Sequence, residues 1–75
     1  MLKLSIITPG TAEKTFEATK VFLPGLVGSF EVLKGHAPLI AALGEGVVRW
    51  DGGEFNISSG VVEVRDNIVK VIAEE

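Results

Sequence analysis

Cysteine is absent from this 75-residue chain, and its absence removes several kinds of site at once. No disulfide framework and no thiolate metal site can form. Histidine occurs once, at His36, which leaves too few ligands for a zinc site. No apolar run approaches the roughly 18 residues of a membrane span, and the N-terminus lacks the pattern of a signal peptide. We therefore expect no metal, no cofactor, no direct membrane insertion and a cytoplasmic location.

Basic residues are also few. Seven Lys and Arg stand against ten Asp and Glu, for a net charge of −3. A nucleic-acid-binding protein needs clustered basic residues to displace counterions from phosphates, so we expect no nucleic-acid partner. The chain is rich in apolar residues, 47% against 23% charged, and this favours a folded core over disorder. We predict a single domain over residues 1–75, with modest stability because a chain this short buries only about 60% of its unfolded surface.

Turn-forming residues recur every several positions, a spacing typical of short strands. The segments between them are rich in β-branched and aromatic residues, which fit a pleated surface. Leu2, Leu4 and Ile6 alternate with polar residues, so that strand should bury one face against a second sheet. The fold class we predict is all-β, with two packed sheets. The predicted strands lie near 2–8, 15–23, 28–33, 39–43, 46–50, 54–58, 61–65 and 68–73.

Two short turns predict hairpins. Asp66-Asn67 tolerates positive φ and separates two alternating segments, and residues 51–53 (Asp-Gly-Gly) do so by the same logic. The apolar run at 39–43, bounded by proline and glycine, is too short to distinguish a strand from a single helical turn. Both structures remain open for it.

The sequence offers little support for catalysis. His36 is the only side chain that ordinarily titrates near neutral pH, so acid–base chemistry would need a carboxylate partner. The strand carboxylates Glu17, Glu31 and Glu63 have apolar neighbours, as the solvent-facing positions of an alternating strand do. No serine lies in a nucleophile elbow. We predict that the chain is not an enzyme.

The glycines and aromatic residues have structural interpretations. Gly25 and Gly28 do not form a phosphate-binding signature, and we interpret them as turn glycines that need positive φ. The aromatic side chains are interpreted as core, because a base-stacking surface would carry basic residues around it. These aromatic residues are Phe16, Phe22, Phe30, Trp50 and Phe55.

The segment 35–43 (GHAPLIAAL) joins a glycine turn, the single histidine and a proline to an apolar run. His36 has two interpretations here. It can be a loop residue that hydrogen-bonds to backbone, or an exposed contact on a rigid corner that meets a partner. The residues alone do not decide between them.

Four motifs, in their order and spacing, resemble the N-terminal β-sandwich domain of the epsilon subunit of F-type ATP synthase. They are LPG at 23–25, GSFEVL at 28–33, GHAPLI at 35–40, and SSGVVEV at 58–64 followed by Asn67. The resemblance extends from about residue 4 to residue 73. It implies a small β-sandwich of about ten short strands, mostly antiparallel.

The resemblance also implies a function. The expected role is that of a non-catalytic central-stalk subunit that links the gamma subunit to the polar loops of the c-ring and couples proton or sodium flow to ATP synthesis. Catalysis would take place on the alpha/beta hexamer. The expected location is peripheral, at the cytoplasmic face of the bacterial inner membrane. The inhibitory and ATP-binding C-terminal helices of longer relatives would be lacking, and their activities with them.

The resemblance assigns candidate interface residues. The expected c-ring contacts are Ser29, Glu31 and His36. The expected gamma contacts are Thr8, Ala41, Ser58 and Glu63.

This sequence departs from the family pattern at several positions. Glu31 and Lys34 add opposite charges to the expected c-ring surface. Ser59-Gly60 replaces a usual pair of glycines, which predicts a looser backbone approach there.

A function of another class stays open as the alternative. The chain could be a stand-alone ligand-binding or carrier-type β-barrel module. A carrier needs a modified lysine at an exposed hairpin tip, and Lys34, next to Gly35, is the only loop candidate.

Overall fold

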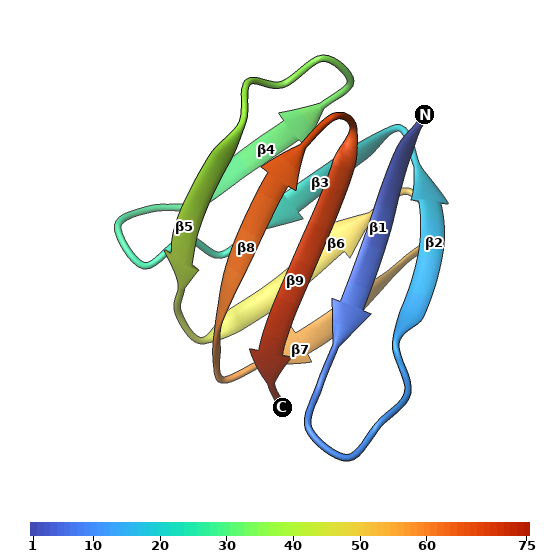
Figure 1. Cartoon of the computed structure of the whole chain (residues 1–75). Helices are drawn as coiled ribbons and strands as arrows, with labels where there is room; N and C mark the ends of the chain where they lie inside the picture. The colour runs from blue at the N-terminus through green and yellow to red at the C-terminus, as the bar shows by residue number, and fades with distance from the viewer.

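The computed structural model describes all residues 1–75 as nine strands in two sheets that pack face to face (Figure 1). It contains no helix, and the predicted all-β sandwich is confirmed. The strands are β1 (Leu2–Ile7), β2 (Lys14–Ala18), β3 (Lys20–Leu23), β4 (Phe30–Leu33), β5 (Leu39–Leu43), β6 (Gly46–Trp50), β7 (Gly53–Ile57), β8 (Ser59–Arg65) and β9 (Ile68–Glu74). The run at 39–43 is therefore a strand.

One sheet has five strands in the order β2-β1-β9-β8-β5, and the other has four in the order β4-β3-β6-β7. Neighbouring strands are antiparallel except β1 and β9, which run parallel. This parallel pair places the first strand beside the last at the centre of the larger sheet. Much of the chain must therefore be in place before the sheet closes.

The core lies between the sheets and consists of small and medium apolar side chains, mostly valine and leucine. Alternation along each strand produces it, since successive side chains point to opposite faces. In β9, for example, Val69, Val71 and Ala73 are buried while the residues between them are exposed. The fully enclosed set is Leu2, Leu4, Ile6, Ala18, Val21, Leu23, Val32, Leu43, Val48, Ile57, Val62, Val64, Val69, Val71 and Ala73.

The prediction that all five large aromatic side chains are core is wrong for Phe22. Its neighbours Val21 and Leu23 take the inward positions of β3, so Phe22 faces solvent and is 43% exposed. The other four, Phe16, Phe30, Trp50 and Phe55, are partly buried and pack against the core. The rings of Phe16 and Trp50 lie with centroids 4.7 Å apart.

The strand predicted over 15–23 is in fact two strands, β2 and β3, which belong to different sheets. The inward positions are Phe16 and Ala18 in β2 but Val21 and Leu23 in β3. The period of two therefore shifts by one residue at Thr19, where the chain leaves the larger sheet. That phase shift marks the break.

The chain crosses between the sheets four times, and each crossing is held by a hydrogen bond from a distant segment. At each crossing a backbone N–H is the donor, and its partner is a carboxylate, an amide side chain or a backbone carbonyl. The donor and acceptor atoms are Thr19 N and Asp51 Oδ1 (3.0 Å), Gly35 N and Asn67 Oδ1 (2.8 Å), Gly44 N and Pro24 O (2.8 Å), and Ser58 N and Glu74 O (2.7 Å).

Both predicted hairpins are present, but their turns differ. Asp66 and Asn67 have φ of 52° and 62°, as expected for a two-residue loop with both residues left-handed. The β6–β7 loop, residues 51–52, contains no residue with positive φ. Its turn therefore does not depend on glycine in the way the sequence predicted.

The prediction of positive φ at Gly25 and Gly28 is also wrong. A Cβ on Gly25 would lie 2.4 Å from the carbonyl oxygen of Gly28, so Gly25 is required by close packing of the loop on itself. A Cβ on Gly28 would meet nothing within 4 Å. A side chain therefore has space at position 28 but not at position 25.

The crossing at Thr19 should make stability depend on pH. The Thr19 N–H, which donates to Asp51, holds the pKa of that carboxyl below its usual range. The charged form thus stabilises the fold above the ordinary aspartate pKa of about 3.9, and this contribution is lost as the pH falls through the lowered value. Asp51→Ala should have a lower melting temperature than the parent at pH 7, and its melting temperature should fall less than that of the parent on acidification. Thermal unfolding from pH 7 to pH 2.5 measures both. An equal fall in melting temperature in variant and parent would contradict this.

Gly60 should tolerate no side chain. A Cβ there would lie 2.7 Å from the carbonyl oxygen of Ile72 and 2.9 Å from the Cβ of Ala73, so the backbone approach predicted to be loose is tight. Gly60→Ala should cost about 1–3 kcal/mol of unfolding free energy, as overpacking does. Gly28→Ala is the matched control and should be neutral or stabilising by about 0.4–1 kcal/mol. Urea denaturation measures both, and similar losses in the two variants would refute the assignment.

Candidate functional site

The molecule has no enclosed catalytic cleft. No group of three or more His, Asp or Glu side chains is arranged to bind a metal ion. The chain also has no helix long and apolar enough to cross a membrane. Two exposed surfaces are the candidate functional regions.

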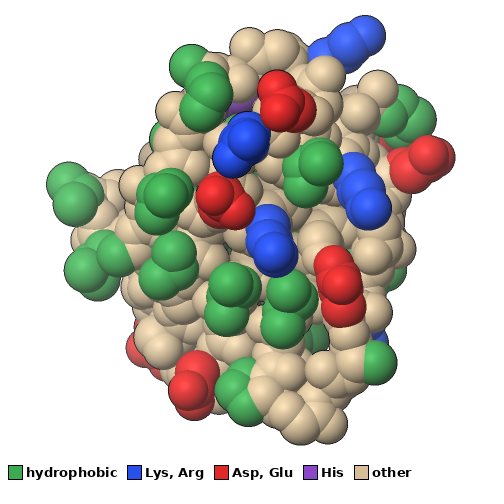
Figure 2. Space-filling view, in the orientation of Figure 1, with side chains coloured by type: hydrophobic (Ala, Val, Ile, Leu, Met, Phe, Trp, Pro, Cys, Tyr) green, Lys and Arg blue, Asp and Glu red, His purple; other side chains and the backbone are tan.

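The first surface is the outer side of the five-stranded sheet, where aliphatic side chains of β1, β5, β8 and β9 gather. They form the apolar face: Ile7, Ile40, Ala42, Val61 and Ile72. In the strand register, Ile7 lies beside Ile72, Ile72 beside Val61, and Val61 beside Ala42. At about 4.8 Å between strands, this row extends roughly 14 Å across the sheet. Figure 2 shows hydrophobic side chains gathered on this side of the molecule.

The β3–β4 loop extends the apolar face beyond the edge strand. The Leu26 N–H donates to Ala42 O at 2.9 Å, which fixes the loop against β5. Both Leu26 and its neighbour Val27 are strongly exposed. The sequence reasoning missed both, although two adjacent large apolar residues inside a glycine-bounded loop are a readable signal.

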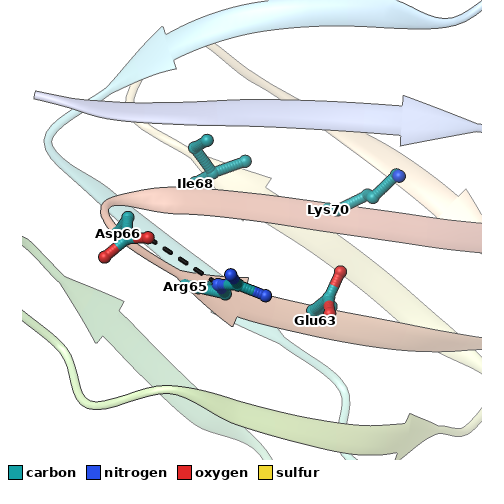
Figure 3. Close-up of a pocket in the computed structure, with 5 residues that line it drawn as sticks. All are labelled: Glu63, Arg65, Asp66, Ile68 and Lys70. Atoms are coloured by element: carbon teal, nitrogen blue, oxygen red, sulfur yellow. Dashed lines mark ion pairs between the residues drawn. The ribbon is translucent and has the colours of Figure 1, made fainter.

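Beside the apolar row lies a charged hollow on the same side of the sheet (Figure 3). Glu63 and Lys70 face each other across β8 and β9. Arg65 Nε lies 3.7 Å from Asp66 Oδ2, and both side chains are exposed. The hollow thus carries two acidic and two basic groups, which suits a mixed protein surface better than a ligand of one charge.

The second surface contains the corner between β4 and β5, residues 34–38. Gly35 has φ of 81°, and the N–H of His36 donates to Leu33 O at 3.1 Å, which closes the turn. Nδ1 of His36 lies 2.7 Å from Ala37 O, so the backbone-bonding interpretation of His36 is confirmed. The ring is only partly buried, and its role as a partner contact stays a prediction.

The three residues expected at the c-ring lie along the edge strand β4 and its two flanking loops. Ser29 precedes β4, and Glu31 lies on its outward side opposite Phe22. His36 follows the other end of the strand. All three are at least partly exposed, but Ser29 and His36 are separated by the length of β4.

The four residues expected at gamma do not form one surface. Thr8 is buried, and Ala41 points inward from β5 toward the core. Ser58 is exposed at the β7–β8 crossing, where its Oγ lies 3.3 Å from Glu74 O. Only Glu63 lies on the outer side of the larger sheet beside the apolar face.

Lys34 is exposed, but it does not occupy a hairpin tip. It lies in the connection that carries the chain from one sheet to the other. The feature that a carrier module would need is therefore missing at this lysine.

Comparison with known proteins identifies the family. The model of the ATP synthase delta/epsilon chain β-sandwich domain matches residues 1–75. The chain belongs to this delta/epsilon family. It is 44% identical to the ATP synthase epsilon chain of Chlorobium limicola over 97% of its own length and 89% of that protein. The epsilon chain of Chlorobaculum tepidum is 46% identical, with 96% and 88% covered.

A solved structure supports the fold. The chain resembles one in the central stalk and c-ring of the Tetrahymena thermophila mitochondrial ATP synthase, with a TM-score of 0.80 and 17% identity over 99% of this chain and 63% of the other. Membership in the delta/epsilon family makes the chain a non-catalytic subunit of the synthase. The resemblance of the sequence motifs to the epsilon subunit is thus confirmed.

Replacement of His36 should have little effect on folding. Its ring makes one hydrogen bond, to the carbonyl of the next residue, and is partly exposed. We expect His36→Ala to change the unfolding free energy by no more than about 0.5 kcal/mol, as surface substitutions usually do. Val32→Ala, in the core beside the same corner, is the comparison and should cost more. Urea denaturation measures both variants. If His36→Ala loses as much unfolding free energy as Val32→Ala, the histidine is needed for the stability of the fold.

Proposed function

We propose that the chain is a rotor subunit of a proton- or sodium-translocating ATP synthase that links the gamma subunit to the c-ring. The observation that carries this proposal is the match of residues 1–75 to the delta/epsilon family. The domain transmits rotation and has no catalytic role. Catalysis belongs to the alpha/beta hexamer, and the complex lies at the cytoplasmic face of the bacterial inner membrane.

A link between two partners needs two surfaces that do not overlap. The apolar face lies on the outer side of the five-stranded sheet, whereas β4 is an edge strand of the opposite sheet. One partner can therefore cover the first surface without covering the second. This separation supports a bridging role.

The apolar face is the proposed gamma surface. A stable protein interface buries about 800 Å² on each partner, and the whole chain exposes 4502 Å². A stable interface therefore needs a broad face, and the apolar row with Leu26 and Val27 provides one. Glu63 and Lys70 border the row, where charged groups favour specific orientation over raw affinity. Of the expected gamma residues, Glu63 fits this surface directly.

The proposed c-ring surface is the edge strand β4 with Ser29 before it and the 34–38 corner after it, whereas Leu26 and Val27 of the preceding loop belong to the proposed gamma surface. Ser29, Glu31 and His36 present polar groups along one side of the domain, which suits the polar loops of the ring. Lys34 adds a positive charge to the same region. Contact with exposed loops needs no insertion of this chain into the membrane.

The gamma surface can be tested with charge substitutions. Val61→Asp combined with Ile72→Asp should weaken binding to purified gamma at least tenfold, because two carboxylates would lose water in an apolar interface. Both positions face solvent in the free chain, so the fold should persist. Isothermal titration calorimetry measures the affinity.

Phe22→Asp is the matched control, since Phe22 is 43% exposed on the opposite sheet and Val61 is 45% exposed. It should leave gamma binding unchanged. If the control weakens binding and the double variant does not, gamma uses the other sheet. If the parent chain fails to bind gamma at all, the proposed function is wrong.

A further inference from the structure

Asn67 joins three segments that are far apart in the sequence. Its side-chain Oδ1 accepts the N–H of Gly35 at 2.8 Å, and its backbone oxygen accepts the N–H of Lys3 at 2.9 Å. It lies in the β8–β9 turn with φ of 62°. The turn of the larger sheet is thus bonded to the β4–β5 corner that carries His36.

The bond to Asn67 adds to the placement that the corner receives from its flanking strands, β4 paired with β3 and β5 paired with β8. Of the corner's three hydrogen bonds, the one from His36 N–H to Leu33 O and the one at the His36 ring are local. Only the bond to Asn67 reaches beyond the corner. Gly35 has positive φ and no side chain, and glycine has more conformational freedom to lose than any other residue. Without Asn67 the local turn would remain, but its placement against the larger sheet would loosen.

The residue type fits both requirements of the site. Position 67 needs left-handed backbone, which asparagine adopts more readily than most residues. It also needs a short side chain with an acceptor oxygen that reaches Gly35. Glycine meets only the first requirement, and aspartate meets both.

We propose that Asn67 is a positioning residue for the c-ring contact, which it serves by fixing the His36 corner in its binding conformation without touching the partner. This inference rests on the proposed function. A preformed corner loses less conformational freedom on binding, so the bond raises affinity. One neutral hydrogen bond is worth about 0.5–1.5 kcal/mol, which corresponds to roughly a two- to tenfold change in affinity.

The test uses the full chain in complex with gamma, bound to membranes that contain the c-ring but have been depleted of this subunit. Asn67→Gly should accelerate hydrogen exchange at the Gly35 amide and weaken membrane binding about two- to tenfold. Asn67→Asp should keep both close to the parent. Affinity of each variant for free gamma should not change, because the corner lies outside the proposed gamma surface.

Each outcome has a distinct meaning. Faster exchange at Gly35 with unchanged membrane binding would overturn the positioning role, as would equal losses in the Gly and Asp variants. If Asn67→Gly does not fold, Asn67 is required for folding and the inference is wrong. His36→Ala separates this from the proposed function: if that variant and both Asn67 variants bind membranes like the parent, the corner is not the c-ring contact.

Discussion

The structure depends on four crossings at which the chain passes from one sheet to the other. Each crossing interrupts the strand ladder and leaves a backbone N–H that must find a partner outside it. Carboxylate, amide and carbonyl oxygens from distant segments accept the N–H groups of Thr19, Gly35, Gly44 and Ser58. A domain of 75 residues has a small core, and these bonds add to the core packing that holds the two sheets together. Polar loop side chains such as Asp51 and Asn67 therefore contribute to the stability of this fold.

The same alternation that fills the core also makes the outer surfaces. Because Val62 and Val64 of β8 and the alternate residues of β9 point inward, Val61 and Ile72 remain outside beside Glu63 and Lys70. Contiguous exposed apolar residues are a feature of interaction sites, and the proposed occupant of this row is gamma. The crossing at Gly35 places a polar corner at the end of the sandwich where the β8–β9 turn lies. The architecture of the domain and the proposed division between two partners thus have a common origin in the sheet pattern.

Much of the fold could be predicted from the sequence, because strand alternation and turn chemistry are local. The hairpin at Asp66-Asn67 is an example, since those residue types tolerate the left-handed backbone they adopt. The break at Thr19 is also visible in the sequence, because the apolar period shifts by one residue between Ala18 and Val21. The prediction of one strand over 15–23 overlooked that shift. Long-range contacts were beyond such reasoning: the pairing of Asn67 with Gly35, and the burial of Thr8, depend on how the sheets assemble. The motif resemblance identified the family, and the expected gamma residues are dispersed over the fold.

Co-sedimentation with membranes can show whether this domain bridges gamma and the c-ring. Purified gamma would be sedimented with membranes that contain the c-ring but lack the other stalk subunits, with and without this chain. If the domain is a bridge, the chain will increase the amount of gamma on the membranes in a saturable way and will sediment with gamma in equal proportion. Gamma retention that is the same with and without the chain would show that the domain does not bridge the two partners.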